Sequence, residues 1–153
     1  MSGSYLEDFK EGEVIESPQS YEITPERLDA YASEFDPQAI HLNPDVAERE
    51  MFGGIVASGW HSLSVTMRLM VLSDLFDGGP VVGVGIDRLR FLEPVRAGDT
   101  LRAQAEVLEA RPSRSHTDRG YLVLRITTLR QDDEPVLTQD WTLLVPRRKP
   151  RPD

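Results

Sequence analysis

The fold is decided by residues 58–76, SGWHSLSVTMRLMVLSDLF. Ser58 is a residue type that favours the N-cap of a helix, because its hydroxyl can accept a hydrogen bond from a free backbone N–H. The apolar residues that follow fall on more than one side of a helix, and a helix of that kind is usually buried. Arg68 and Asp74 interrupt the run, which is also too short to span a bilayer. We therefore expect a long buried helix at the centre of the domain, running through Phe76.

The residues on either side of this helix predict strands and two further helices. Downstream, apolar and polar residues alternate in four stretches separated by turn-forming residues, at 81–92, 100–110, 121–130 and 136–145. Upstream lie a strand at 14–23 and helices at 25–36 and 44–51, each helix opened by a capping residue and a proline. Strands joined by short turns are antiparallel. This order predicts an α+β domain in which a curved, five-stranded antiparallel sheet wraps around the long helix.

The composition indicates the class of protein. The chain has 153 residues, no Cys and a formal net charge of −9, which fits one globular domain over residues 1–153 and argues against nucleic acid as the main partner. The first residues lack the basic and apolar segments of a signal peptide. We therefore expect a cytoplasmic protein with no membrane segment, with an N-terminal arm at 1–11 and a flexible tail at 147–153.

Candidate chemistry begins with Asp36 and His41, which lie five residues apart in FDPQAIH (35–41). An ionised Asp and a His that converge on one water can polarise it and pass on a proton. Each residue taken alone also has a structural interpretation, Asp36 as a turn residue before a proline and His41 as a hydrogen-bonded core histidine. The combination with the sequence that follows favours the chemical interpretation.

Two other kinds of site receive little support. His41 and His61 together with Asp36 or Asp45 match no known metal-ligand spacing, so we expect no metal. Ser62 and Ser64 fall inside the long helix rather than in a strand-to-helix nucleophile elbow, which argues against a serine hydrolase.

Gly59 opens the long helix and offers a site for negative charge. The first backbone N–H groups of a helix lack partners within it and lie at the positive end of its dipole. Gly59 has no side chain to block approach, so a thioester carbonyl placed there would have its developing enolate charge stabilised. The alternative is that Gly59 only allows close packing at the start of the helix.

These residues together resemble the MaoC-like acyl dehydratases, which include the (R)-specific enoyl-CoA hydratases. The resemblance rests on FDPQAIH (35–41), Asn43-Pro44 and FGGIVASGWH (52–61), and it extends over about residues 8–146. It implies the hot-dog fold, an antiparallel sheet wrapped around a long helix, with subunits paired into dimers. The order of elements derived above agrees with that fold.

The resemblance also assigns roles to individual residues. Asp36 and His41 match the pair that holds and activates the catalytic water, and which of the two is acid or base stays open because they titrate together. Gly59 matches the glycine whose N–H stabilises the thioester oxygen. Ser64 falls near a Ser that contacts the active-site pair in the family.

Three departures from the family pattern bear on the substrate side of the site. Gln38 and Ala39 stand where the family commonly has Asn and Pro, which changes the loop but keeps an amide near the pair. Trp60 replaces a more usual Met. We expect Trp60 to be a core residue, with shaping of the acyl pocket as the alternative.

The implied reaction is hydration of a trans-2-enoyl thioester or the reverse dehydration, with no cofactor. The substrate would be carried by coenzyme A or acyl carrier protein. Arg111 and Arg114 are the first choice for a phosphate clamp and Arg88 and Arg90 the second, although an ordinary charge on a strand or loop is the favoured interpretation of each. We expect a homodimer. The alternatives are a hot-dog thioesterase and a non-catalytic acyl-CoA-binding subunit.

Overall fold

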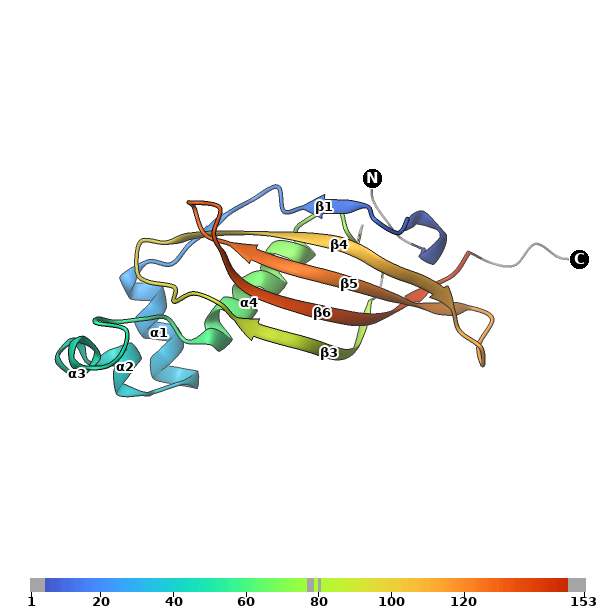
Figure 1. Ribbon diagram of the computed structural model, residues 1–153. Helices are drawn as coiled ribbons and strands as arrows, with labels where there is room; N and C mark the ends of the chain where they lie inside the picture. Colours follow the sequence, from blue (N-terminus) through green and yellow to red (C-terminus); the bar gives the residue numbers. More distant parts are fainter. Residues whose placement is uncertain (1–4, 77–78, 80, 149–153) are drawn as a thin grey trace, which may run out of the picture.

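The computed structural model describes residues 5–76, 79 and 81–148, and its elements follow the expected order (Figure 1). A 3-10 helix η1 is followed by two short strands, four helices and four long strands. Their bounds are η1 Leu6–Asp8, β1 Val14–Glu16, β2 Tyr21–Glu22, α1 Pro25–Phe35, α2 Ala39–Leu42, α3 Pro44–Arg49, α4 Gly59–Val71, β3 Val82–Phe91, β4 Thr100–Pro112, β5 Arg119–Leu129 and β6 Pro135–Pro146. The expected turn at 77–80 falls largely outside the described residues.

The strands form an antiparallel sheet in the order β1-β4-β5-β6-β3, with β2 also paired to β4. The expected α+β hot-dog architecture is confirmed, but the single strand expected at 14–23 is divided into β1 and β2. Pro18 lies between them, and proline has no N–H to donate to a neighbouring strand. There the Ser17 hydroxyl replaces a ladder carbonyl, because it accepts a hydrogen bond from the Ala103 N–H at 3.0 Å.

Helix α4 crosses behind the sheet and packs on its inner face (Figure 1). Val65, Leu69 and Met70 on the packed side of α4 are buried in the core among the inward side chains of the long strands. The expectation of a helix buried all round is wrong: Met67 and Val71 are about half exposed. The sheet covers only one side of α4, so the other side meets solvent in the single chain.

Helix α4 also ends at Val71 rather than at the expected Phe76. Beyond it the chain turns, and the Ser73 hydroxyl donates to the Met70 carbonyl at 2.6 Å and accepts from the Leu75 N–H at 3.2 Å. A serine hydroxyl that bonds to nearby backbone in this way competes with helix continuation. Leu75 and Phe76 remain buried after the turn, which explains why the sequence pattern extends beyond the helix.

The two described ends of the chain are held together. Leu6 and Phe9 of the N-terminal arm are buried in the core. Arg147, which we expected to begin a flexible tail, donates to the Glu7 carboxylate at 3.1 Å, and the Arg148 N–H donates to the other oxygen of Glu7 at 3.1 Å. Residues 149–153 of the expected tail lie outside the described residues.

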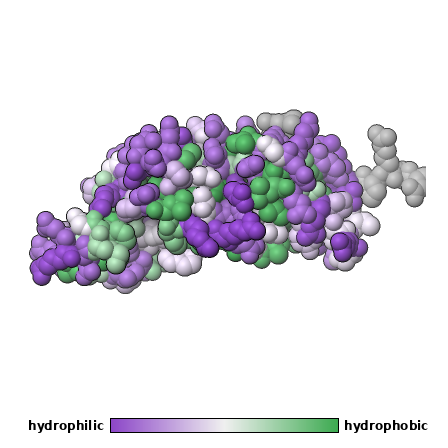
Figure 2. Space-filling model, in the orientation of Figure 1, coloured by the Kyte–Doolittle hydropathy of each residue, from purple (hydrophilic) through white to green (hydrophobic). Residues whose placement is uncertain are grey.

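Polar and apolar side chains are mixed on the outer face of the sheet. Figure 2 shows hydrophilic side chains separating the hydrophobic ones on this face, with no apolar patch that spans it. Asp140 on β6 is nearly buried there and accepts from the Arg125 guanidinium at 3.0 and 3.3 Å. Within the described ranges, no helix is long and apolar enough to cross a membrane.

Helices α1, α2 and α3 gather at one end of the sheet, and the β4–β5 hairpin lies at the opposite end (Figure 1). The start of α4 is next to the three helices, and β3 also ends at this side of the molecule. Segments that carry residues 36–41, 58–62 and 91–95 therefore meet at one place, although they are far apart in the sequence.

Candidate active site

Helix α1 places Asp36. The Thr24 hydroxyl caps the start of this helix by accepting from the Arg27 N–H at 3.2 Å. Asp36 is the C-cap and leaves helical geometry because Pro37 follows it. The chain then turns into α2, which carries His41, so His41 lies in a one-turn helix rather than in an open loop. The two side chains meet directly, with His41 Nε2 at 3.1 Å from Asp36 Oδ2.

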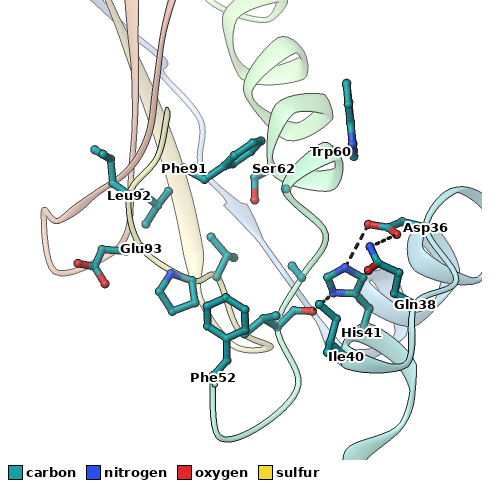
Figure 3. A pocket seen from close by; sticks show the side chains of 16 residues that line it. Asp36, Gln38, Ile40, His41, Phe52, Trp60, Ser62, Phe91, Leu92 and Glu93 are labelled. Atoms are coloured by element: carbon teal, nitrogen blue, oxygen red, sulfur yellow. Dashed lines mark hydrogen bonds and ion pairs between the residues drawn. The ribbon is translucent and has the colours of Figure 1, made fainter. Parts of the chain in front are cut away.

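The Asp36 carboxylate is held by three side chains (Figure 3). The Ser58 hydroxyl donates to Oδ2 at 2.7 Å, the Gln38 amide donates to Oδ1 at 2.7 Å, and His41 also faces Oδ2. The hydrogen bond from Ser58 and then that from Gln38 lower the pKa of Asp36 below its usual value, against an opposing effect of burial. Asp36 is therefore a carboxylate throughout the neutral range.

The His41 ring is fixed at both nitrogens. Its Nδ1 lies 2.6 Å from the Val56 carbonyl oxygen, and its Nε2 faces Asp36. The Val56 carbonyl and the Asp36 carboxylate can only accept hydrogen bonds. Each contact is therefore a hydrogen bond only when the ring nitrogen that faces it carries a proton. The side chain is only 6% exposed, which holds the ring in one orientation beside the carboxylate.

Gly59 is the first residue of α4, and the Phe91 ring occupies the space that a side chain would take. A Cβ added there would lie 2.6 Å from Cε1 of the Phe91 ring. As the first helical residue, Gly59 also has no carbonyl within the helix to accept from its N–H. The glycine thus lets the Phe91 ring approach the start of the helix, and the residue itself lies at the wall of the cavity described next.

These residues line a cavity of about 340 Å³ (Figure 3). One wall is the Asp36–His41 pair with Gln38, and a second is the start of α4 with Trp60 and Ser62. The third wall is mainly apolar and comes from the end of β3 and the loops near it, including Phe52, Phe91 and Leu92. Glu93 adds a carboxylate to that wall.

Arg96 holds the loop that supplies Phe52. Its guanidinium donates to the Phe52 carbonyl at 2.5 Å, while its own N–H donates to Asp99 at 2.8 Å. Gly53 in this loop has a φ of 64°, which favours glycine. The wall is therefore tied to the turn that follows β3 rather than left to move freely.

The structure brings most of the expected site residues together. Asp36, His41, Gln38, Gly59 and Trp60 all line the cavity. The expectation of a core position for Trp60 is wrong, because the residue is 64% exposed. Gln38 contacts the carboxylate of the pair directly, so its first role in this structure is to hold Asp36.

Ser64 lies apart from the pair. Its hydroxyl donates to the Trp60 carbonyl at 2.9 Å and lies 3.2 Å from the Tyr31 hydroxyl. Ser64 therefore connects α4 to α1, and it is not among the residues that line the cavity.

Arg111 and Arg114 are also not brought to the site. Both belong to the β4–β5 hairpin region, at the end of the sheet opposite α1–α3 (Figure 1). Arg111 lies 3.1 Å from Glu109 and stacks over Tyr121 at 4.5 Å. The second candidate for the phosphate clamp, Arg88 with Arg90, is not at the site either, since Arg88 contacts Asp140 on the outer face of the sheet.

His61 points to a different neighbour from His41. Its ring stacks on Tyr31 at 4.5 Å with an interplanar angle of 2°. Burial lowers the pKa of His61, and nearby Arg27 adds to this effect. No three His, Asp or Glu side chains in the described part of the chain group as metal ligands would.

The sequence did not indicate the roles of two serines at the site. Ser58 was expected to cap α4, and it does, by accepting from the Trp60 N–H at 3.3 Å. Its second bond, to Asp36 across 22 positions of sequence, has no local signal. Ser62 was considered only as a nucleophile, and its position in the cavity wall emerges from the packing of α4.

Comparison with known proteins agrees with the fold described above. The family model described as the MaoC like domain matches residues 8–125. A crystal structure of a MaoC-like dehydratase from Rhodospirillum rubrum has 36% sequence identity and a TM-score of 0.90, and the match covers 97% of this chain and 100% of that one. An uncharacterized protein of Bacillus subtilis, YdeM, is 28% identical over 142 residues, which are 93% of this chain and 99% of YdeM.

A more distant structure shares the fold. The R-hydratase PhaJ1 from Pseudomonas aeruginosa has a TM-score of 0.72 at 24% identity, with 95% of this chain and 87% of that chain covered. At this identity the similarity shows a common architecture.

Proposed function

The chain belongs to the MaoC-like dehydratase family, and we propose that it is an (R)-specific enoyl-CoA hydratase or 3-hydroxyacyl-CoA dehydratase. The observation that carries the proposal is the convergence of the Asp36–His41 pair and the Gly59 amide on one cavity. The similarity to the MaoC-like dehydratase from R. rubrum supports the type of reaction.

The carboxylate of Asp36 has room for one more donor. Two carboxylate oxygens offer about four acceptor positions. Three are used, two on Oδ2 by Ser58 and His41 and one on Oδ1 by Gln38. A water that donates to the remaining position on Oδ1 would be oriented at the cavity wall, beside the His41 ring.

The Gly59 amide would bind the other end of the reacting system. With the thioester oxygen on this N–H, negative charge that develops on the oxygen meets the positive end of α4. The water oxygen then bonds to the β-carbon as the double bond shifts to the enolate. The Asp36–His41 pair takes one water proton and returns one to the α-carbon, so the pair ends in its starting protonation state.

The cavity walls fit an acyl thioester and need no cofactor for this chemistry. Phe52, Phe91 and Leu92 offer apolar contact for an acyl group, and the half-open cavity leaves a path for the carrier. We propose an acyl group carried by coenzyme A or acyl carrier protein.

We further propose that the chain acts as a homodimer. Strand β3 is the edge of the sheet, and Val82, Val84 and Ile86 on it are more than half exposed. Met67 and Val71 extend this apolar surface onto α4. An unpaired edge strand with an apolar surface favours pairing with a second copy. Light scattering at micromolar concentration should give the dimer mass, and a monomer mass would remove this proposal.

The test of the reaction is the loss of enoyl absorbance with a panel of short, long and branched trans-2-enoyl-CoAs. Asp36→Asn and His41→Ala should each lower kcat by about 100-fold or more, as expected for loss of an acid–base group. Asp29→Asn is the matched control, since Asp29 is an exposed acid on α1. The product should be the (R)-3-hydroxyacyl thioester.

Two outcomes would contradict the proposal. Release of free thiol without hydration would indicate a hot-dog thioesterase. Binding of acyl-CoA with no turnover of any thioester would indicate a non-catalytic subunit.

A further inference from the structure

The start of α4 offers only one unoccupied backbone donor to the cavity. The Trp60 N–H donates to the Ser58 hydroxyl at 3.3 Å. The His61 and Ser62 N–H groups donate to the Ser58 carbonyl at 3.0 and 3.3 Å. Of the N–H groups of residues 59–62, only that of Gly59 has no acceptor among the described residues. A second hydrogen bond to a substrate oxygen beside Gly59 would therefore come from a side chain that lines the cavity.

Ser62 is the side chain in position to supply that bond. It lies three residues after Gly59, so both are on the same face of α4. Side chains on a helix lean toward its N-terminus, which brings the Ser62 hydroxyl back toward Gly59. The residue is 4% exposed and lines the cavity, and Figure 3 shows its oxygen pointing from α4 into the cavity.

The Ser62 hydroxyl is also unused, unlike its neighbours. Those of Ser58, Ser64 and Thr66 bond to the Asp36 carboxylate, the Trp60 carbonyl and the Ser62 carbonyl respectively. The hydroxyl of Ser62 has no hydrogen-bond partner among the described residues. Ser62 Oγ is not one of the fully enclosed polar atoms that lack a partner, and the residue lines the cavity, so the hydroxyl is open to the cavity and can bond to a ligand there.

We propose that Ser62 is a further catalytic residue, whose hydroxyl donates the second hydrogen bond to the thioester oxygen beside the Gly59 N–H. This role rests on the proposed hydratase or dehydratase function. The hydroxyl keeps its proton throughout, and its bond strengthens as the carbonyl oxygen becomes an enolate oxygen. Its contribution therefore appears mainly in the transition state.

The test compares Ser62→Ala and Ser62→Thr with the wild type. Ser62→Thr keeps the hydroxyl, and Ser33→Ala is the matched control because Ser33 is exposed on α1, outside the cavity. Ser62→Ala should lower kcat by about 10- to 100-fold with little change in KM, since the lost bond acts in the transition state. Ser62→Thr should retain most of the activity, and Ser33→Ala all of it. A saturated acyl-CoA, which forms no enolate, should inhibit wild type and Ser62→Ala with the same constant.

The outcomes separate this role from the proposed function. Turnover by the wild type with an unchanged kcat in Ser62→Ala would overturn the role of Ser62 alone. Equal losses in Ser62→Ala and Ser62→Thr would also overturn it, because packing rather than the hydroxyl would then matter. Covalent acylation of Ser62, detected by mass, would replace it with a nucleophilic role. Failure of the wild type to hydrate any enoyl thioester would overturn both proposals.

Discussion

Replacing Ser58 by Ala should disturb both the helix start and the Asp36 carboxylate, because one hydroxyl bonds to both. The residue is 1% exposed, donates to Asp36 and accepts from the Trp60 N–H. Loss of an N-cap side chain costs about 1 kcal/mol, and loss of a hydrogen bond to a charged group about 1.5–3 kcal/mol. Asp36 keeps Gln38 and is 15% exposed to water, so the second cost should fall at the lower end.

The expected loss is therefore about 2–3 kcal/mol of unfolding free energy for Ser58→Ala. In a chain of 153 residues this lowers the melting temperature by about 5–10 °C. Ser58→Gly separates the two effects, because glycine is a tolerable N-cap that also lacks the hydroxyl. It should recover part of the stability lost in Ser58→Ala.

The same substitution has a consequence for the pH dependence of activity. The Ser58 hydrogen bond is the largest cause of the lowered pKa of Asp36. Without it the pKa rises, so Asp36 is protonated at higher pH and activity falls earlier as the pH is lowered. Both Ser58→Ala and Ser58→Gly should move the acid limb of kcat/KM upward.

Urea denaturation and a pH profile of hydration measure the two effects of Ser58. A stability of Ser58→Ala within about 0.5 kcal/mol of wild type would refute the energetic reasoning, since that is the range of a neutral surface change. An acid limb that stays in place would show that the Asp36 carboxylate does not depend on Ser58.

Three further changes follow from the structure. Gly59→Ala keeps the backbone N–H but places a Cβ where the Phe91 ring now lies. The helix preference of Ala (~1 kcal/mol) should offset displacement of this exposed ring, so the melting temperature should change little. The Cβ should block the approach of the thioester oxygen and lower kcat about 100-fold, and a fully active variant would show that the oxygen does not bind beside Gly59. His61→Phe should reduce the loss of stability on acidification. The lowered pKa of His61 means that the unfolded chain binds a proton near pH ~6.5 that the folded chain binds less well. The stability that neutral His61 contributes is therefore present above that pH and is lost below it. Urea unfolding at about pH 7.5 and about pH 5.5 compares the two proteins, and equal pH dependence would contradict this. Arg96→Ala should release the Phe52 wall and raise KM about 2- to 10-fold with a smaller change in kcat, whereas an unchanged KM would show that the loop holds without this bond.

Local sequence signals predicted the elements well where local physics decides them. Thr24, Asn43 and Ser58 each accept a backbone N–H at the start of the helix they were expected to cap. The alternating pattern is clearest in β5, where every second residue is buried, and it holds over the first half of β4, whereas no residue of β3 is buried. The departures come from side chains that act on the backbone, namely the proline that divides the strand at 14–23 and the Ser73 hydroxyl after α4.

The candidate site depends more on tertiary structure than the helices and strands do. Asp36, His41 and Gly59 could be selected because the residue types and their spacing carry a recognisable pattern. The exposed position of Trp60 depends on which side of α4 the sheet covers, and the periodicity of that helix does not show this. The distance of Arg111 from the pair depends on the length and direction of β4, which ends at the far side of the sheet.

The sequence by itself determined the order of the elements, the capped helix start and the residue types available for water chemistry, since these depend on neighbours a few positions apart. Tertiary structure alone decided which hydroxyls reach the site. Ser58, Ser62 and Ser64 belong to one short stretch of the same residue type, yet one holds the Asp36 carboxylate, one faces the cavity and one bonds to α1. The physical reason is that side chains leave α4 in different directions around its axis, and only the packing of distant segments determines what each one meets.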